Sequence, residues 1–474
     1  MRINKIILIM VLSAALLFPK MYSLTLKECV EIAKQNNKEL QKAREEVGKY
    51  KQEYNNVRGN LFPQISISGG YNYKNTRLPD SAIPPSMSLA DEIYIDDDFV
   101  DVPSNNDTLL IANDQIIADF LDGSMNSLIP DQKQIEYSLF AQVKLDQVIF
   151  MGGKLINGIN IAGKLYHLQE KKYFLVEQEI IYQTINMYYQ TKLAERIWKI
   201  QQETLNFAKE YLEQVSNMFD QGLVSEYDLL RAKLEVQKIE PELMESKKNY
   251  ELITESFKNF LNMKNEELAL TDEIVLPLMD EINLENAIQE GLENRMEIEL
   301  SEINVAVNKV TLRYEKGNFL PIIGLSAEYN YFGQDEEQIE SDDYGNYFQI
   351  GVGFSMPLFT GLSNTAKRTK ALHTLKQAQL DHQDLLENID LDVRNSYLQW
   401  KTDLEKVTTQ TENVSLAEKG LQIAQARYEN QVSNQLELID AQLQLKIAKL
   451  NYMNALYSVS ISYEKLKKAM GREL

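Results

Sequence analysis

The sequence predicts a mostly α-helical, internally duplicated chain in which long antiparallel coiled-coil helices accompany four β-strands. Two observations carry this prediction. The segment GNLFPQISISGGYNY at 59–73 returns as GNFLPIIGLSAEYNY at 317–331, a shift of 258 residues. Farther along, 219–232 aligns with 428–441 at a shift of 209, so the first half holds one insertion of 258 − 209 = 49 residues. Two halves that differ by one insertion indicate a single supersecondary unit used twice.

The N-terminus reads as a secretory signal. Arg2 and Lys5 precede the apolar run IILIMVLSAALLF, and small residues lead up to Ser23. That run is shorter than the ~18 apolar residues of a membrane helix, so we predict a signal peptide over 1–23, with an uncleaved anchor as the alternative. The remaining chain divides into a first repeat, a linker and a second repeat, at 24–262, 263–281 and 282–474.

Each repeat is predicted to run helix, strand, strand, long helix and return helix. A helix of about 65 residues at ~1.5 Å each is about 100 Å long and has to lie against other helices. The apolar steps Leu205, Ala208, Leu212, Val215 and Phe219 recur at Val414, Ala417, Leu421, Ala424 and Tyr428, which is typical of a coiled-coil seam. The predicted ranges are helices 24–58 and 282–316, breaking at Asn36–Asn37 and near Asn294, strands 63–77, 135–150, 321–333 and 345–358, long helices 154–218 and 363–427, and return helices 226–262 and 435–470.

The predicted strands alternate apolar and polar residues. In the last strand Phe348, Ile350 and Val352 alternate with Gln349 and Gly351. The second strand follows the same rule, with Phe140 as its exception among polar residues. Period two suits either a half-buried soluble sheet or a membrane barrel. A length of about 12 residues, rather than the usual five or six, and aromatic residues at the strand ends favour the barrel.

Four strands cannot close a barrel on their own. An open sheet edge in lipid leaves backbone groups unsatisfied at several kcal/mol each, so the chain has to oligomerise. Three copies of four strands give twelve, an allowed even number. The strand count alone does not choose between a trimer and a dimer.

Composition excludes several classes of function. A net charge of −21 repels nucleic acid. The single cysteine, Cys29, allows no disulfide framework or thiolate metal site, and its counterpart Ala287 indicates a small buried helix residue. The three histidines fall in no catalytic or metal-binding motif, so we predict no enzyme, cofactor or metal site.

Several motifs resemble one known family. They are GN-x-x-P opening a strand, VIFMGG and PLFTGL closing one, and FDQGLVSEYDLLRA at a helical turn. These resemble the TolC-type outer-membrane efflux protein (outer membrane factor) family over nearly the whole mature chain, twice. The resemblance implies a homotrimer in the cell outer membrane, with a twelve-stranded β-barrel continued by an α-helical barrel across the periplasm. It also implies passive export, with an inner-membrane transporter delivering substrates through a periplasmic adaptor protein.

The same resemblance implies a gate at the helical turns. Its acidic ring positions are Glu437 and Asp440, one turn apart, which would favour cations in a narrow mouth. The alternative for both is an ordinary acidic helix start. The implied link between the coils joins Tyr428 to Asp228, and the adaptor-facing turn is Gly222, Leu223, Val224 and Ser225.

The second turn departs from the family pattern. Ser433 stands where an arginine is usual, with Arg231 as a candidate substitute, and Gln431 stands where glycine is usual. These departures place the second inter-coil link and the shape of that turn in question.

Three questions stay open on the sequence. Small-molecule efflux and type I protein secretion fit the channel equally well. A soluble periplasmic coiled-coil scaffold explains the helices but not the long two-faced strands. The acidic segment 78–133 is expected to be a solvated extracellular loop.

Overall fold

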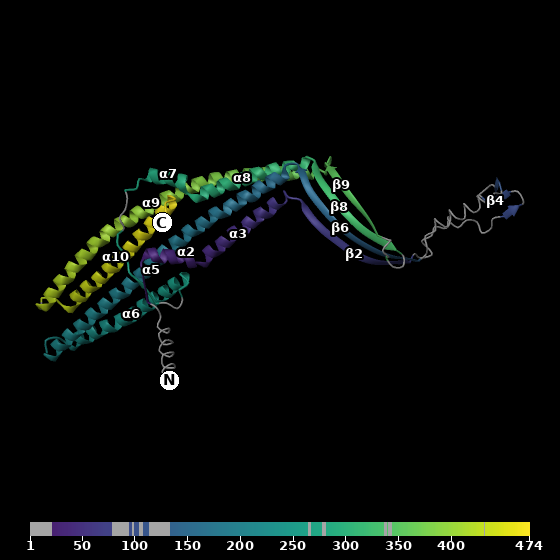
Figure 1. Ribbon diagram of the computed structural model, residues 1–474. Helices are drawn as coiled ribbons and strands as arrows, with labels where there is room; N and C mark the ends of the chain where they lie inside the picture. Colours follow the sequence, from purple (N-terminus) through teal and green to yellow (C-terminus); the bar gives the residue numbers. More distant parts are fainter. Residues whose placement is uncertain are drawn as a thin grey trace, which may run out of the picture. The chain divides into compact units, whose positions relative to one another are not determined.

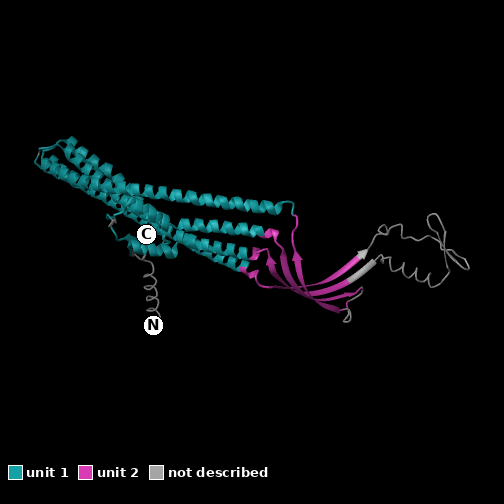
Figure 2. Cartoon of the chain, turned by 90° about the horizontal axis from the view of Figure 1, so that it is seen from above, with its two compact units in different colours: residues 1–57, 156–316, 360–474 teal, residues 58–155, 317–359 magenta. Residues whose placement is uncertain are grey.

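The chain divides into two compact units in a computed structural model (Figure 1, Figure 2). A helical unit comprises 1–57, 156–316 and 360–474, and a strand unit comprises 58–155 and 317–359. The structure describes residues 21–77, 94–96, 99–103, 108–112, 133–263, 267–276, 281–335, 339, 344–430 and 432–474. The predicted signal peptide, apart from 21–23, and most of the segment 78–133 lie outside this description.

Two short helices open each repeat. They are α2 (Leu26–Asn36) and α3 (Lys38–Gly59) in the first repeat, and α7 (Leu284–Asn294) and α8 (Met296–Lys316) in the second. The breaks fall at Asn37 and Arg295, which both adopt extended backbone with ψ of 128° and 126°. Both predicted breaks are confirmed. Cys29 on α2 and Ala287 on α7 are almost completely buried, as their small size predicts.

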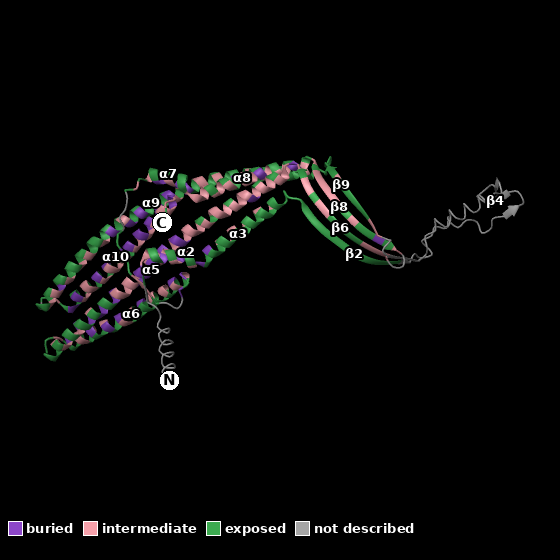
Figure 3. Ribbon diagram, in the orientation of Figure 1, coloured by how far each residue is buried: buried purple, intermediate pink, exposed green. Residues whose placement is uncertain are grey.

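The long helices are equal in length in the two repeats. α5 (Lys154–Asp220) and α9 (Ser363–Glu429) each have 67 residues, and the return helices α6 (Glu226–Phe260) and α10 (Gln435–Ala469) each have 35. The predicted ends agree within two residues at each terminus. The coiled-coil seam is buried at Leu205, Ala208 and Val215 on α5 and at Ala424 on α9, so helix-on-helix packing forms the core of this unit (Figure 3).

A small parallel pairing joins the start of the first repeat to the segment between the repeats. β1 (Met21–Leu24) pairs with β7 (Glu267–Leu270), inside the segment predicted as a linker. The buried Tyr188 of α5 accepts a hydrogen bond from the backbone N–H of Asp272 at 3.0 Å, and buried Lys192 donates to the carbonyl of Leu270 at 3.2 Å. Because the predicted signal peptide ends at Ser23, its cleavage there would remove three of the four residues of β1.

The strand unit contains one four-stranded antiparallel sheet. Its order is β2 (Gln64–Arg77), β6 (Lys133–Met151), β8 (Ile322–Asp335) and β9 (Tyr344–Ser355), and the pairing of β6 with β8 joins the two repeats. The motif glycines meet at this join, because a Cβ on Gly152, whose φ is +58°, would collide with the carbonyl oxygen of Gly317. The predicted last strand, 345–358, runs three residues past the end of β9. β9 stops at Ser355 because Pro357 has no N–H to donate to a ladder.

The sheet keeps the two faces that its sequence predicts. On the polar face the Ser68 hydroxyl donates to Gln142 at 3.4 Å, and the Gln142 amide donates to Glu328 at 3.3 Å. On the apolar face Ile67 is 81 % exposed and Phe354 is 69 % exposed. A half-buried soluble sheet would have covered these side chains, so the exposed apolar face favours the membrane alternative.

The insertion in the first repeat holds more order than the predicted loop. β3 (Tyr94–Asp96), β4 (Phe99–Pro103) and β5 (Thr108–Ala112) form an antiparallel sheet, whereas the rest of 78–132 lies outside the described residues. These strands are only three to five residues long, which is too short for alternation to separate them from loop. Across the described residues, none of the helices is sufficiently long and apolar to span a membrane.

Candidate gate at the helical turns

The first helical turn is built by a glycine and a capping box. Gly222 has φ of +74°, which lets the chain leave α5 and reverse. Ser225 then caps α6: its hydroxyl donates to the Asp228 carboxylate at 2.6 Å and accepts from the Asp228 N–H at 3.2 Å. Of the predicted adaptor-facing residues, Gly222, Leu223 and Ser225 are exposed and Val224 is half-buried.

The second turn uses a different cap. Asn434 is the N-cap of α10, and its side chain accepts a hydrogen bond from the N–H of Glu437 at 3.1 Å. The backbone N–H of Ser433 donates to the carbonyl of Arg427 at 3.3 Å. Gln431 lies outside the described residues, so the expected change in turn shape at that position stays a prediction.

The carboxylate of Glu437 forms an ion pair within its own hairpin. The Nε of Arg427 on α9 lies 3.2 Å from Oε1 of Glu437, and both side chains are about half exposed. Arg427 did not emerge from the sequence as a site residue. The available signal was a basic residue in the last turn of α9, opposite the acidic first turn of α10 across a short connection.

Asp440 lies beside α6 rather than α9. It lines a groove of about 520 Å³ between α6 and α10, together with Arg231 and Lys238 of α6. Arg231, the candidate substitute for the arginine that Ser433 replaces, therefore shares a groove with Asp440. Although the two acidic residues are one helical turn apart on α10, Glu437 pairs with α9, whereas Asp440 lines the groove beside α6.

Tyr211 lies against Tyr428 and within the electrostatic influence of Asp228. The rings of Tyr211 and Tyr428 pack with centroids 5.5 Å apart. Burial, the Tyr428 hydroxyl and the nearby Asp228 charge together raise the pKa of Tyr211. The carboxylate of Asp228 is bonded to Ser225, whereas its backbone carbonyl accepts from the Gln435 amide at 3.3 Å.

An apolar cluster holds both turns together around these residues. Tyr211 and Val215 of α5, Ala232 of α6, Ala424 of α9 and Leu438 of α10 are its buried members. The two hairpins therefore share one core beside the turns. The predicted direct link from Tyr428 to Asp228 remains a prediction, and the structure adds Tyr211 and Gln435 to it.

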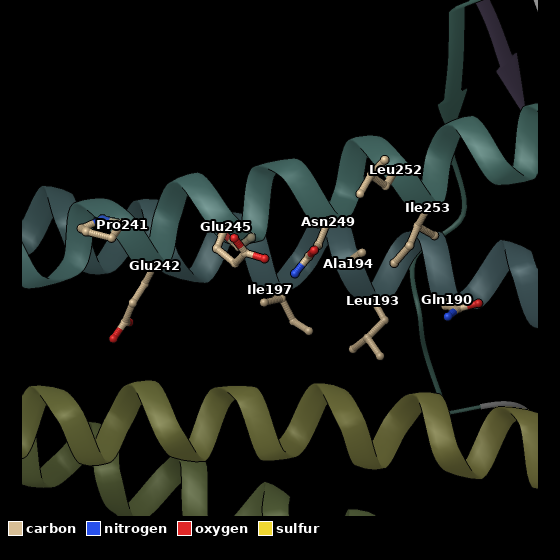
Figure 4. A pocket seen from close by; sticks show the side chains of 11 residues that line it. Gln190, Leu193, Ala194, Ile197, Pro241, Glu242, Glu245, Asn249, Leu252 and Ile253 are labelled. Atoms are coloured by element: carbon tan, nitrogen blue, oxygen red, sulfur yellow. The ribbon is translucent and has the colours of Figure 1, made fainter.

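Farther from the turns, ion pairs connect α10 to the first hairpin. Lys446 lies 2.5 Å from Glu242 of α6, and Lys449 lies 3.3 Å from Glu203 of α5. Nearer the end of α10, Lys468 pairs with Glu179 of α5. We call these three pairs the ion-pair ladder. Figure 4 shows Glu242 projecting from α6 at the end of an apolar groove of about 870 Å³, which α5 and α6 line.

No reactive centre accompanies the gate in the part of the chain that the structure describes. There, no group of three His, Cys, Asp or Glu side chains is placed to hold a metal ion. His167 contacts Glu170 on the same helix, α5, and His382 of α9 contacts Ser301 of α8. The arrangement at the two chain reversals consists of charged side chains beside shared apolar packing.

Paired helical hairpins with a two-faced antiparallel sheet are the fold that this chain shares with solved outer-membrane channels. The structure resembles CusC, with a TM-score of 0.72 at 15 % identity over 96 % of this chain and 94 % of that one. It also resembles the CmeC outer membrane channel of Campylobacter jejuni, with a TM-score of 0.71 at 17 % identity over 94 % and 85 %.

The family follows from the sequence comparison. The model of the outer membrane efflux protein family matches residues 122–259 and 287–472. Outer membrane protein TolC of Salmonella enteritidis is 21 % identical over 338 residues, covering 70 % of this chain and 68 % of that protein. TolC of Vibrio cholerae is 20 % identical over 343 residues, covering 70 % and 76 %. The chain belongs to the outer membrane efflux protein family, and it is an outer-membrane channel protein that extends into the periplasm.

Proposed function

We propose that three copies of the chain join into a twelve-stranded barrel and form the outlet of a tripartite export system. The observation that carries this proposal is the order of the sheet, which leaves β2 and β9 as edge strands. Both edges adjoin an exposed apolar face suited to lipid, where unpaired backbone groups cost several kcal/mol each. Joining β2 of one copy to β9 of the next satisfies both edges, and three such contacts close a ring.

The proposed partners follow from the exposed surfaces. The apolar face of the sheet contacts outer-membrane lipid. A periplasmic adaptor protein contacts the turn Gly222–Ser225, where Leu223 is exposed, and an inner-membrane transporter delivers the substrate. Transport through the barrel is passive, with energy supplied by the transporter.

The proposed gate combines symmetry with charge. Threefold symmetry gathers three copies of Glu437 and three of Asp440 at the periplasmic mouth, which favours cations. Arg427 offsets the charge of Glu437 within each chain. Arg231 and Lys238 share a groove with Asp440, so basic side chains lie near both carboxylates.

Cross-linking tests the edge-to-edge trimer. In a Cys29→Ala background, Ile67→Cys on β2 is combined in turn with Ile350→Cys, Val352→Cys and Phe354→Cys on β9. At least one combination should yield covalent trimers under oxidation in detergent, because the two edges meet between copies. Ala141→Cys on the central strand β6, combined with Ile350→Cys, is the control and should yield none. A protein that stays monomeric in detergent, with no cross-link in any combination, contradicts the trimer.

The type of export requires a cellular experiment. Deleting the gene and comparing drug susceptibility with the profile of secreted proteins separates small-molecule efflux from type I secretion. Efflux predicts increased susceptibility, whereas secretion predicts loss of a specific extracellular protein. Release of the protein from the envelope by salt alone would instead support a soluble scaffold.

A further inference from the structure

Two phenylalanines lie on the polar face of the sheet, against the alternation of their strands. Register places Gly70, Phe140, Phe332 and Gly345 side by side across β2, β6, β8 and β9. A neighbouring row on that face holds polar Ser68, Gln142 and Asn330 and ends at Tyr347 on β9. Phe140 is thus half of an aromatic pair that crosses from the first repeat to the second.

The glycines at both ends of this row make room for the rings. A Cβ on Gly70 would lie 2.8 Å from a ring carbon of Phe140, and one on Gly345 would lie 3.0 Å from a ring carbon of Phe332. Each ring therefore lies over the backbone of the adjacent strand. Tyr347 extends the group, with its ring 6.1 Å from that of Phe332 in an edge-on arrangement.

The three rings keep much of their surface open. Phe140, Phe332 and Tyr347 are 43 %, 44 % and 46 % exposed. If the apolar face meets lipid, as the proposed function requires, this opposite face lines the water-filled interior. Exposed aromatic faces in water favour contact with other apolar or aromatic groups, and they attract cations.

We propose that Phe140, Phe332 and Tyr347 form an aromatic row on the channel wall that transiently binds exported solutes carrying an aromatic group. Aromatic cations are the preferred class, because a chain with net charge −21 concentrates cations and the ring faces attract them. Three copies of the row line the trimer. This inference rests on the proposed function.

The competing role is structural, with rings that only cover glycine backbone. The other face of the sheet provides a matched case, since a Cβ on Gly333 would lie 2.9 Å from a ring carbon of Tyr344. Tyr344 also stacks on Tyr331, with centroids 5.2 Å apart. Removing the Tyr344 ring therefore removes a ring-over-glycine contact without changing the polar face.

The test measures block of potassium current through the purified protein in planar lipid bilayers. Benzyltriethylammonium is compared with tetraethylammonium, which lacks the aromatic ring. For Phe140→Ser with Phe332→Ser, the half-blocking concentration of the benzyl compound should rise about threefold or more, with little change for tetraethylammonium. Phe140→Leu with Phe332→Leu keeps an apolar cover over the glycines and should show the same loss. Tyr344→Ser should leave both values unchanged.

The outcomes separate the two proposals. If the double variants conduct and the half-blocking concentration of the benzyl compound is unchanged, the proposed binding by the aromatic row is wrong, whereas the proposed channel stands. A wild-type protein that forms no conducting pore overturns the proposed function and, with it, this inference. If the serine variants fail to assemble, the leucine pair decides the question.

Discussion

Arg427 at the end of α9 and Glu437 at the start of α10 form an ion pair across the second helical turn, with 3.2 Å between Nε and Oε1. Both residues lie in the hairpin of the second repeat, and both are about half exposed. A pair so exposed contributes about 1 kcal/mol or less to stability. Its consequence is electrostatic, because the cation lowers the net negative charge at the proposed gate.

Replacing Arg427 with Gln should therefore strengthen cation selectivity. The uncompensated Glu437 carboxylate adds negative charge at the mouth, so the potassium-to-chloride permeability ratio should rise in bilayer recordings. Arg394→Gln is the matched control, since Arg394 forms a 2.8 Å pair with Asp390 along α9. Equal ratios in wild type and Arg427→Gln would place Glu437 away from the ion path.

Removing the carboxylates should have the opposite effect. Glu437→Ala with Asp440→Ala should weaken cation preference and block by divalent cations. The double variant is the informative one, because basic side chains lie near both carboxylates: Arg427 pairs with Glu437, and Arg231 and Lys238 share a groove with Asp440. Unchanged selectivity and unchanged divalent block in the double variant would remove both residues from the pore.

The ion-pair ladder should restrain movement of α10 relative to the first hairpin. Lys446→Ala with Lys449→Ala removes two of its three pairs, so the channel should open more often in single-channel recordings. Higher salt should raise the opening of wild type and affect the variant less, since salt screens exposed pairs.

Two further variants check the ladder. The exchange Glu242→Lys with Lys446→Glu restores a pair of opposite order and should return opening toward the wild-type value. Lys248→Ala is the control, because Lys248 pairs with Glu245 within α6 and connects no second helix. An effect of Lys248→Ala as large as that of the ladder variant would refute the restraint.

Alkaline pH should destabilise the fold through Cys29. Burial raises the pKa of its thiol to about 12 from an ordinary value of 9.0. Between these values the unfolded chain loses the proton that the folded chain keeps, so this contribution to stability is complete below pH 9 and disappears as pH rises toward 12.

Cys29→Ala is the informative variant, because alanine occupies the equivalent buried position 287. The variant should lose less unfolding free energy than wild type between pH 8 and pH 10, at about 1.4 kcal/mol per pH unit for a fully titrating group. Urea unfolding in detergent at the two pH values measures the difference. Identical losses in the two proteins would show that the thiol is not protected in the folded state.

The elements of the fold were predictable because duplication supplied each pattern twice. The long helices begin and end within two residues of their predicted bounds, and the breaks after Asn36 and Asn294 are where the repeats place them. The end of β9 was missed although Pro357 was visible, because apolar alternation continues through Leu358. Alternation reports which face a side chain takes, and it carries no information on whether a backbone N–H is present.

The candidate site was less predictable. Asp228 and Tyr428 could be located by their place in the turns, but not their neighbours: Asp228 is hydrogen-bonded to Ser225 and Gln435, and Tyr428 packs against the ring of Tyr211. Tyr211 lies 217 residues before Tyr428 (428 − 211), and no local pattern links positions so far apart. Such partners are set by helix packing, in which a small rotation exchanges one neighbour for another.

By itself, the sequence determined the duplication, the helices, the two-faced strands and the family, because each is written in local periodicity or in motifs that occur twice. Only the tertiary structure decided that Arg427 pairs with Glu437, that Asp440 faces α6, and that Phe140 lies beside Phe332. The physical reason is that periodicity places a side chain on a face of its own element. The neighbour it meets there depends on the register and rotation of another element, which packing of the whole chain sets.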